Sequence, residues 1–236
     1  MKTNKVYIVG AGPGDPELIT VKGLRALEKA DCVLYDFLSS PQLLKHLRKS
    51  CEKICVGKAD GLHLLEQRQI NALLYEKAKK YKTVVRLKGG DPFVFSRGYE
   101  EAAYLKRKKV ECEVIPGVTS ALAGPESVGI PITIKNKVSS VALVAGRKKD
   151  KNAVIEAPLC GTVVYLMAVG NIANVVKALR KSGRNVKTPC AFIERATNKK
   201  ARYIKGTIGT IVKKVKEENI QPPAVFIVGE VVEKRL

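Results

Sequence analysis

Short apolar runs alternate with longer amphipathic segments along the first half of the chain. The apolar runs predict strands over residues 6–9, 32–35, 53–56, 83–87 and 113–115. Apolar residues at helical spacing predict helices over 20–30, with Thr20 as its N-cap, and over 41–47, 64–80 and 99–108. Strands that alternate with helices in this way are typical of a mostly parallel sheet.

The second half continues with elements of similar length. We predict strands over 140–145, 162–167, 190–194 and 224–228, helices over 172–182 and 207–218, and a strand pair within 202–206. Between the halves, residues 117–131 are rich in Gly, Pro, Ala and Ser, with a short helix expected at 119–123. We place the junction there, so that one α/β domain spans 1–116 and another spans 117–236.

The composition is that of a globular protein with an excess of basic residues. Hydrophobic residues make up 45% of the 236 residues, which is enough for a packed core. The net charge of +21 attracts polyanions, such as nucleic acid, an anionic membrane or a polycarboxylate substrate, although a solvated lysine-rich surface is the alternative. No run of Lys and Arg resembles a nucleic-acid-binding tail, no apolar run reaches the roughly 18 residues that span a bilayer, and no signal-peptide core is seen. We therefore expect a cytoplasmic protein without nucleic-acid or membrane partners.

Residues that ligate metals are few. The six cysteines form no C-x-x-C pair, and the chain has two histidines. We expect no metal site, and we interpret the cysteines as small core residues of a protein in a reducing compartment.

Two glycine-rich turns carry the clearest sign of a ligand. Gly10-Ala11-Gly12-Pro13-Gly14 follows the first predicted strand, and Gly89-Gly90-Asp91-Pro92 follows the strand at 83–87. Glycine lets a ligand approach the backbone, and open α/β sheets bind ligands at the carboxyl ends of their strands. The carboxylate of Asp91 has two open interpretations, a contact to a ligand or the cap of a helix that begins at Pro92.

The first turn only partly matches the dinucleotide-binding fingerprint. That pattern needs a third Gly or Ala where this chain has Asp15, and Pro13 lacks the amide that would hold a phosphate. A nicotinamide-dependent oxidoreductase is therefore disfavoured.

Asp36 and Lys58 each follow the end of a predicted strand. In a parallel sheet they share one edge with the glycine turns. A carboxylate and an amine at that edge suit general base and general acid catalysis, whereas a surface ion pair is the structural alternative. Their spacing alone leaves both open.

The order and spacing of these segments resemble the tetrapyrrole methylase family over almost the whole chain, and within it the members that act on uroporphyrinogen III. The matching strings lie at 9–18, 30–36, 40–41, 56–58, 85–95, 115–121, 129–133, 222–224 and 228–232. The resemblance implies two α/β domains that differ from a Rossmann methyltransferase, with the active site in the cleft between them. The N-terminal domain would form the tetrapyrrole side of the cleft, and the C-terminal domain would complete the S-adenosylmethionine site.

The resemblance also implies an activity and the residues that carry it. Methyl groups from S-adenosylmethionine would pass to ring positions 2 and 7 of uroporphyrinogen III, giving precorrin-2 by way of precorrin-1 for sirohaem or cobalamin biosynthesis, with S-adenosylhomocysteine as the other product. The residues implied to bind S-adenosylmethionine are Pro13, Gly89, Gly90, Asp91, Val94, Thr119, Ser120, Met167, Ala196 and Ala224. Asp36 would be the proton acceptor and Lys58 the proton donor, and relatives imply a homodimer. Because the substrate is a polycarboxylate, the basic residues Arg86, Lys88, Arg97 and Lys135 are candidates to bind it.

Three positions differ from the family pattern. Ala59 follows Lys58 where a basic residue is usual, Tyr99 follows Gly98 where a second glycine is usual, and Ile134-Lys135 replaces His-Arg. All three concern carboxylate binding rather than the S-adenosylmethionine loops. A later precorrin or cobalt-precorrin C-methyltransferase of the same family is therefore the alternative activity, and a non-catalytic nucleic-acid-binding protein is the alternative from another class.

Overall fold

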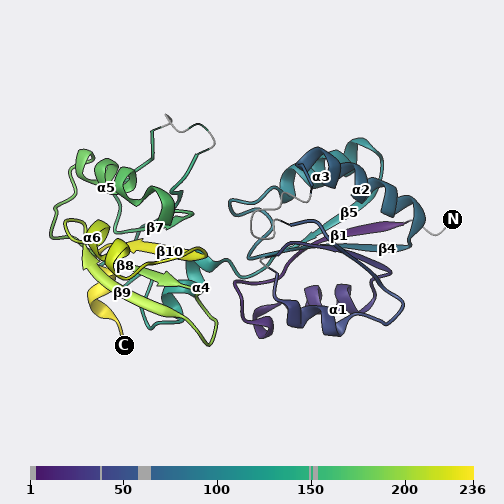
Figure 1. Cartoon of the computed structure of the whole chain (residues 1–236), viewed down its shortest axis with the longest axis horizontal. Coiled ribbons are helices and arrows are strands. Elements are labelled where there is room, and N and C mark those ends of the chain that lie inside the picture. Colours follow the sequence, from purple (N-terminus) through teal and green to yellow (C-terminus); the bar gives the residue numbers. More distant parts are fainter. Residues whose placement is uncertain (1–3, 38, 58–64, 149, 151–153) are drawn as a thin grey trace. The chain divides into compact units, whose positions relative to one another are not determined.

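The chain divides into two compact units, each with its own five-stranded sheet. The computed structural model describes residues 4–37, 39–57, 65–148, 150 and 154–236, and its units are Met1–Thr119 and Ser120–Leu236. The sequence analysis put the junction between residues 116 and 117. Helical segments cover both faces of each sheet (Figure 1), so the predicted α/β class is confirmed.

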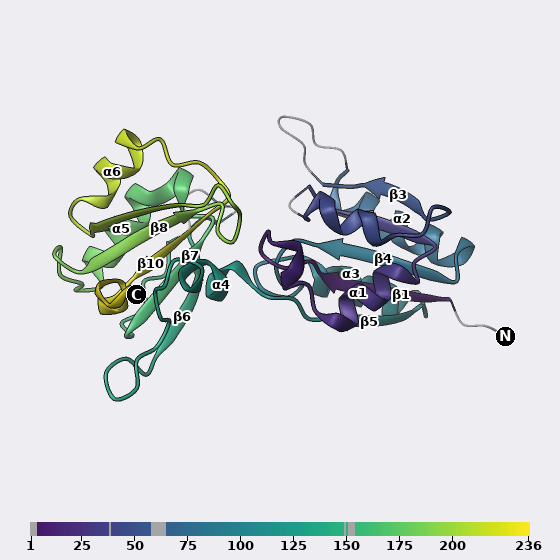
Figure 2. The same cartoon turned by 90° about the horizontal axis from the view of Figure 1, so that it is seen from below.

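The first unit is built on a parallel sheet in the order β3–β2–β4–β1–β5. Its strands are β1 (Lys5–Gly10), β2 (Cys32–Tyr35), β3 (Glu52–Cys55), β4 (Thr83–Lys88) and β5 (Glu111–Ile115). Every pairing between neighbours is parallel, so all these strands end at the same edge (Figure 2). The parallel sheet predicted from the alternating pattern is confirmed for this unit.

Two helical layers enclose that sheet. The helix α1 (Val21–Glu28) and the 3-10 turns η1 (Pro16–Leu18) and η2 (Pro41–His46) belong to one side, and α2 (Gln67–Lys80) and α3 (Gly98–Arg107) cover the other. The hydroxyl of Thr20 caps α1 by accepting a hydrogen bond from the Gly23 amide at 3.1 Å, as predicted. The helix α2 begins at Gln67 rather than at residue 64, because Glu66 and Gln69 form a capping box there.

The second unit has a mixed sheet in the order β6–β7–β10–β8–β9. Its strands are β6 (Val141–Ala145), β7 (Thr162–Leu166), β8 (Pro189–Glu194), β9 (Arg202–Thr207) and β10 (Ala224–Val228). Of these described strands only β6 and β7 pair in parallel, and the other pairings are antiparallel. The prediction of a strand pair within 202–206 is wrong, because β9 is a single strand there. The connection from β8 to β9 is short and contains no helix, so the two strands are antiparallel neighbours.

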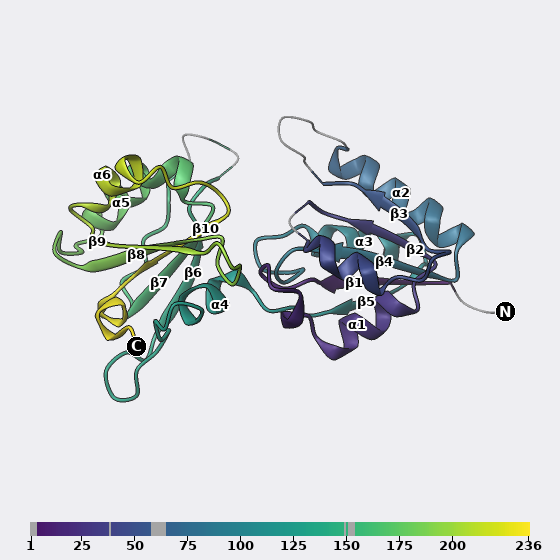
Figure 3. The ribbon, with the colours of Figure 1, turned by 60° about the horizontal axis from the view of Figure 1, so that its bottom comes forward.

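Aromatic side chains fill the core on one face of this second sheet. The helices α5 (Ile172–Lys181) and α6 (Ile211–Glu217) cover that face, while α4 (Ser120–Glu126) and the 3-10 turn η4 (Glu230–Lys234) cover the other (Figure 3). The rings of Phe192 and Phe226 stack with their centroids 4.6 Å apart. The helix α6 begins at Ile211 rather than at 207, because the Thr210 hydroxyl accepts the Thr207 amide in a preceding turn. Within the described residues no helix is long and apolar enough to cross a membrane.

Candidate active site

The ends of the parallel strands in the first unit bring together the residues predicted from the N-terminal half. We call the last residue of β1 and the segments that follow β1, β2, β4 and β5 the carboxyl edge; they are residues 10–13, 36–37, 89–94 and 116–119. Lys58, the predicted proton donor, lies outside the described residues, as does Ala59.

Glycines allow three of these segments to approach one another closely. The Gly90 amide donates to the Gly12 carbonyl at 2.7 Å, and the Gly12 amide donates to the Gly90 carbonyl at 3.3 Å. A Cβ atom on Gly117 would lie 2.4 Å from the Gly90 carbonyl oxygen and 2.6 Å from the Gly10 Cα. Gly10 and Gly117 are therefore required for packing between segments.

Gly90 has a different environment. Its φ of +67° is one that glycine adopts readily, and a Cβ atom added to it would meet nothing within 4 Å. Among the described residues, space is thus left beside the Gly90 Cα.

The carboxylate of Asp91 holds the carboxyl edge together. Its Oδ1 accepts the amides of Phe93 at 2.8 Å and Val94 at 3.2 Å, and its Oδ2 accepts the amide of Gly117 at 3.1 Å. The interpretation of Asp91 as a helix cap at Pro92 is wrong, because the next helix begins at Gly98. Oδ1 thus accepts two hydrogen bonds and Oδ2 accepts one, so Oδ2 is the oxygen that can accept a further hydrogen bond from a ligand.

Charged side chains form a buried network behind Asp36. Arg86 donates from Nη2 to Asp36 Oδ1 at 2.5 Å and from Nε to Glu101 Oε1 at 3.1 Å. Lys88 Nζ lies 3.2 Å from the same Glu101 oxygen and 3.8 Å from Asp36 Oδ2. The Asp36 side chain is 25% exposed, whereas those of Arg86 and Glu101 are 2% and 0% exposed. Asp36 is therefore the member of this network that solvent or a substrate reaches most easily.

Burial and neighbouring charges set the protonation of the two cations. Burial alone would lower the pKa of the Arg86 guanidinium, but the carboxylates of Glu101 and Asp36 together outweigh it, and the pKa is raised. Burial lowers the pKa of Lys88, and the charge of Arg86 lowers it further, while Glu101 and Asp36 act in the opposite direction. Arg86 thus remains a fixed cation, and Lys88 is an ammonium that loses its proton more readily than usual.

Arg97, another predicted residue of this unit, lies at the surface. Arg97 pairs with Glu100 at 2.6 Å, with its side chain 56% exposed. Exposed aromatic rings accompany it, because Phe93 and Tyr99 meet edge to face with centroids 6.2 Å apart. The sequence analysis did not single out this aromatic pair as a functional feature.

Predicted residues of the second unit gather at one edge of its sheet. Met167 follows β7, Ala196 follows β8, and Ala224 begins β10. Because β10 is antiparallel to both β7 and β8, its start lies beside their ends. The backbone there is unusual: Met167, Arg195 and Thr197 have φ values of 60°, 49° and 64°. L-residues adopt this left-handed conformation at an energetic cost. Residues with such strained backbones are frequent at functional sites.

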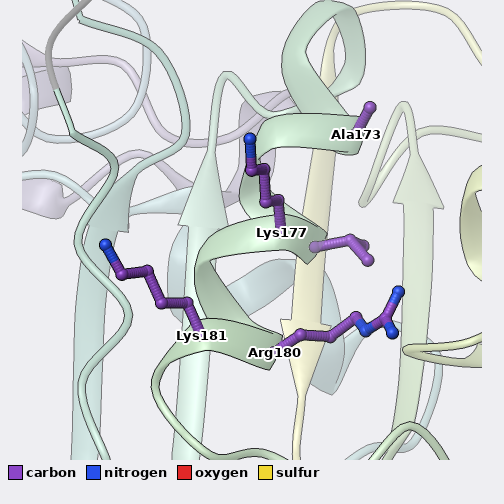
Figure 4. A pocket seen from close by; sticks show the side chains of 5 residues that line it. Ala173, Lys177, Arg180 and Lys181 are labelled. Atoms are coloured by element: carbon purple, nitrogen blue, oxygen red, sulfur yellow. The ribbon is translucent and has the colours of Figure 1, made fainter.

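The structure also places the predicted residues Thr119, Ser120 and Lys135. Thr119 and Ser120 lie at the junction of the units, and Lys135 is exposed in the turn between Ile134 and Val138. A surface hollow of about 430 Å³ lies over α5 (Figure 4). The side chains that line it are Ala173, Val176, Lys177, Arg180 and Lys181, none of which was predicted to be functional.

Glu101 is the member of the charged network that sequence reasoning missed. It occupies a buried position of α3, one helical turn before the buried Leu105. An acidic residue at an inward position of an amphipathic helix is the signal that was available, since such a residue is buried only with partners. Its partners on β4 became evident only from the structure.

Comparison with known proteins assigns the family. Residues 5–212 match the family model described as Tetrapyrrole (Corrin/Porphyrin) Methylases. A uroporphyrinogen-III C-methyltransferase of Methanocaldococcus jannaschii is 51% identical, with 98% of this chain and 97% of that protein covered. A uroporphyrinogen-III C-methyltransferase of Priestia megaterium is 46% identical, over 97% of this chain and 98% of that protein. The chain belongs to the tetrapyrrole methylase family, and the resemblance seen in the sequence is confirmed.

Solved structures agree with this assignment. A uroporphyrin-III C-methyl transferase from Thermus thermophilus, complexed with S-adenyl homocysteine, is similar with a TM-score of 0.83 and 38% identity, covering 98% of this chain and 100% of that one. A cobalt precorrin-4 methyltransferase is similar with a TM-score of 0.83 and 29% identity, covering 97% of this chain and 95% of that one.

Proposed function

We propose that the protein is an S-adenosylmethionine-dependent C-methyltransferase that methylates uroporphyrinogen III at ring positions 2 and 7 to give precorrin-2. The observation that carries this proposal is 51% identity, over 98% of the chain, to a protein named for that activity. The similar cobalt precorrin-4 methyltransferase is 29% identical to this chain. Because this identity is lower than 51%, a later corrinoid intermediate is the less favoured substrate.

The residues present suit S-adenosylmethionine. The space beside Gly90 on the first unit suits the approach of this ligand, and so does the edge of the second unit that carries Met167, Ala196 and Ala224. When bound, S-adenosylmethionine supplies a methyl group already activated by its positive sulfur. We retain Pro13, Gly89, Asp91, Val94, Thr119 and Ser120 as further proposed contacts.

Asp36 is suited to accept a proton from the substrate. Its Oδ1 is held by Arg86 at 2.5 Å, which orients the carboxylate while part of it stays exposed. A carboxylate held in this way can take the proton that the ring system releases during methylation. Lys58 stays the proposed proton donor.

Two pairs of basic residues serve different purposes in this proposal. Arg97 and Lys135 are exposed and suit contacts to substrate carboxylates. Arg86 and Lys88 were proposed for the same task, but their inward hydrogen bonds favour contacts to Asp36 and Glu101 instead. We also propose a homodimer and a cytoplasmic location, on the resemblance to the family.

Anaerobic incubation with S-adenosylmethionine and uroporphyrinogen III tests the function. We expect a product heavier by two methyl groups in the mass spectrum, and at least about a hundredfold slower formation by Asp36→Asn, because a general base is lost. Asp31→Asn is the matched control, since Asp31 precedes β2 at the opposite end of that strand and pairs with Arg48. If S-adenosylmethionine binds but no methyl transfer occurs, the proposed substrate is wrong and a later precorrin takes its place.

A further inference from the structure

The buried charges of the first unit converge on a single oxygen. Glu101 Oε1 accepts hydrogen bonds from Arg86 Nε at 3.1 Å, from Lys88 Nζ at 3.2 Å and from Gln67 Nε2 at 3.1 Å. The Glu101 side chain is 0% exposed, and its Oε2 is buried without a hydrogen-bond partner among the described residues. Burying a carboxylate in this way is costly, so the arrangement needs an explanation beyond stability.

The secondary structure brings these groups together. Arg86 and Lys88 are two residues apart on β4 and so point to the same face of the sheet. The helix α3 presents Glu101 to that face, and α2 presents Gln67. The parallel register pairs Leu34 with Arg86 and Tyr35 with Leu87, which places Asp36, the residue after β2, beside Lys88.

We propose that Glu101 is a positioning residue that holds Arg86 and Lys88 against the carboxylate of Asp36. The inference rests on the proposed function, in which Asp36 accepts the proton. Without the charge of Glu101, two buried cations would face one carboxylate. Lys88 would then lose its proton readily, and Asp36 would be left with Arg86 as its one remaining cationic partner in the network.

Other groups around Glu101 have smaller effects. Cys112 on β5 faces it as a neutral thiol, because burial raises the pKa of Cys112 to about 11. Glu100 and Arg97, at the start of α3, pair with each other at the surface. Glu101 is therefore the anion best placed to keep Lys88 protonated, together with Asp36 at 3.8 Å.

Glu101→Gln is the central variant, because it keeps the shape of the side chain and removes its charge. We expect the pKa of Lys88 to fall further, since the closest anion is lost. Nuclear magnetic resonance of the lysine ε-carbon and ammonium signals measures this titration without any substrate, and Lys88→Arg assigns the signal. The matched control is Glu52→Gln. Glu52 lies on β3, and its Oε1 is 2.7 Å from Nζ of Lys77 on α2, so this substitution also removes a carboxylate from a lysine. It is expected to leave the Lys88 titration unchanged.

Kinetics then connect the network to catalysis. In Glu101→Gln we expect kcat to fall about tenfold or more and the alkaline limb of the pH profile to move to lower pH, while KM for S-adenosylmethionine changes less than about twofold. Partial unfolding of the variant would lower kcat at every pH without moving the alkaline limb of the pH profile. An unchanged Lys88 titration, or a fall in kcat with an unmoved limb, would overturn the proposal.

Two further measurements cover a variant that fails to fold. Glu101→Asp keeps the charge but moves it away from Nζ of Lys88. We therefore expect its Lys88 titration to lie between those of the unaltered protein and Glu101→Gln. A Lys88 titration that does not shift in this variant would contradict the proposal. In the unaltered protein, the Lys88 ammonium signal is expected to be protected from solvent exchange, and its absence contradicts the proposal as well. If the unaltered protein does not methylate uroporphyrinogen III, the proposed function fails while the Lys88 titration still decides whether Glu101 holds Lys88.

Discussion

The two units have similar α/β architectures, but they differ in how many charged side chains they bury. Arg86, Lys88 and Glu101 are buried in the first unit, whereas Glu194 is the buried charged side chain described in the second. The second unit instead buries stacked aromatic rings between its sheet and the helices α5 and α6. Under the proposed function, this difference means that the first unit uses part of its interior to hold the carboxylate of Asp36, while the second uses its interior for packing.

The functional edges differ in backbone as well. The first unit brings strand ends together through glycines, whereas the second uses the side-chain-bearing residues Met167, Arg195 and Thr197 in left-handed conformations. One edge is shaped by the absence of side chains, and the other keeps them at a conformational cost. Four substitutions probe this contrast, beginning with the largest expected effect.

Phe226→Ala tests the aromatic core of the second unit. The ring is 0% exposed and stacks on Phe192, so we expect the free energy of unfolding of this unit to fall by about 3–5 kcal/mol. Hydrogen exchange in urea measures it, with lost protection in β8 and β10 and retained protection in β1 and β4. Val154→Ala, at a position 80% exposed, is the control. Equal losses in both units would mean that the two cores do not differ as described.

Gly117→Ala tests the packing of the carboxyl edge. The added Cβ atom would lie 2.4 Å from the Gly90 carbonyl oxygen, so we expect about 1–3 kcal/mol of destabilisation and weaker binding of S-adenosylmethionine. Thermal unfolding and titration calorimetry measure the two effects. Gly170→Ala is the control, because a Cβ atom there meets nothing within 4 Å. An unaffected Gly117→Ala protein would show that the segments need not approach closely.

Met167→Gly tests the energetic cost of the left-handed backbone at Met167 in the second unit. Glycine relieves the left-handed backbone, so this variant should be more stable than Met167→Ala by about 1 kcal/mol. Both variants remove the side chain, and therefore both should bind S-adenosylmethionine more weakly than the unaltered protein. Chemical denaturation compares the pair. Equal stability of the two variants would argue against stored strain at this position.

Glu113→Gln is expected to have the smallest effect. Hydrogen bonds from Lys22 and then from Lys5 lower the pKa of Glu113 below its usual 4.5, so the stabilisation is present above that value and disappears as pH falls through the lowered one. The pairs are partly exposed, and we expect a loss of about 1 kcal/mol or less at neutral pH. Denaturation at pH 7 and at about pH 3 should show a larger difference at the higher pH. An equal difference in acid would assign the effect to packing rather than charge.

The sequence predicted the strands of both units well, and their directions only in the first. The boundaries of β2 and β10 were predicted to the residue, because β2 is an apolar run between Asp31 and Asp36 and β10 is one between Pro223 and Gly229. Periodicity does not encode strand direction. Helices between successive strands indicated parallel pairing in the first unit, but the antiparallel neighbours of β10 are distant in sequence and left no such sign.

The candidate site shows the same limit. Asp36 was predicted to share an edge with the glycine turns, since both follow parallel strands. Its contact to Arg86 depends on the register between β2 and β4, and the contact of Arg86 to Glu101 depends on how α3 packs on the sheet. Neither contact can be predicted from the spacing of residues along the sequence. The inward orientation of Arg86 and Lys88 was for that reason not expected.

This inward orientation separates the arrival of a substrate from its reaction. Because Arg86 and Lys88 are already neutralised by carboxylates, they add little to the field that draws a polyanion from solution. That attraction comes from the exposed part of the +21 charge, which salt screens over about 8 Å at physiological ionic strength. Interactions inside the buried network are screened far less. Ionic strength would therefore govern how often the enzyme captures its substrate, while leaving the pace of each turnover almost untouched.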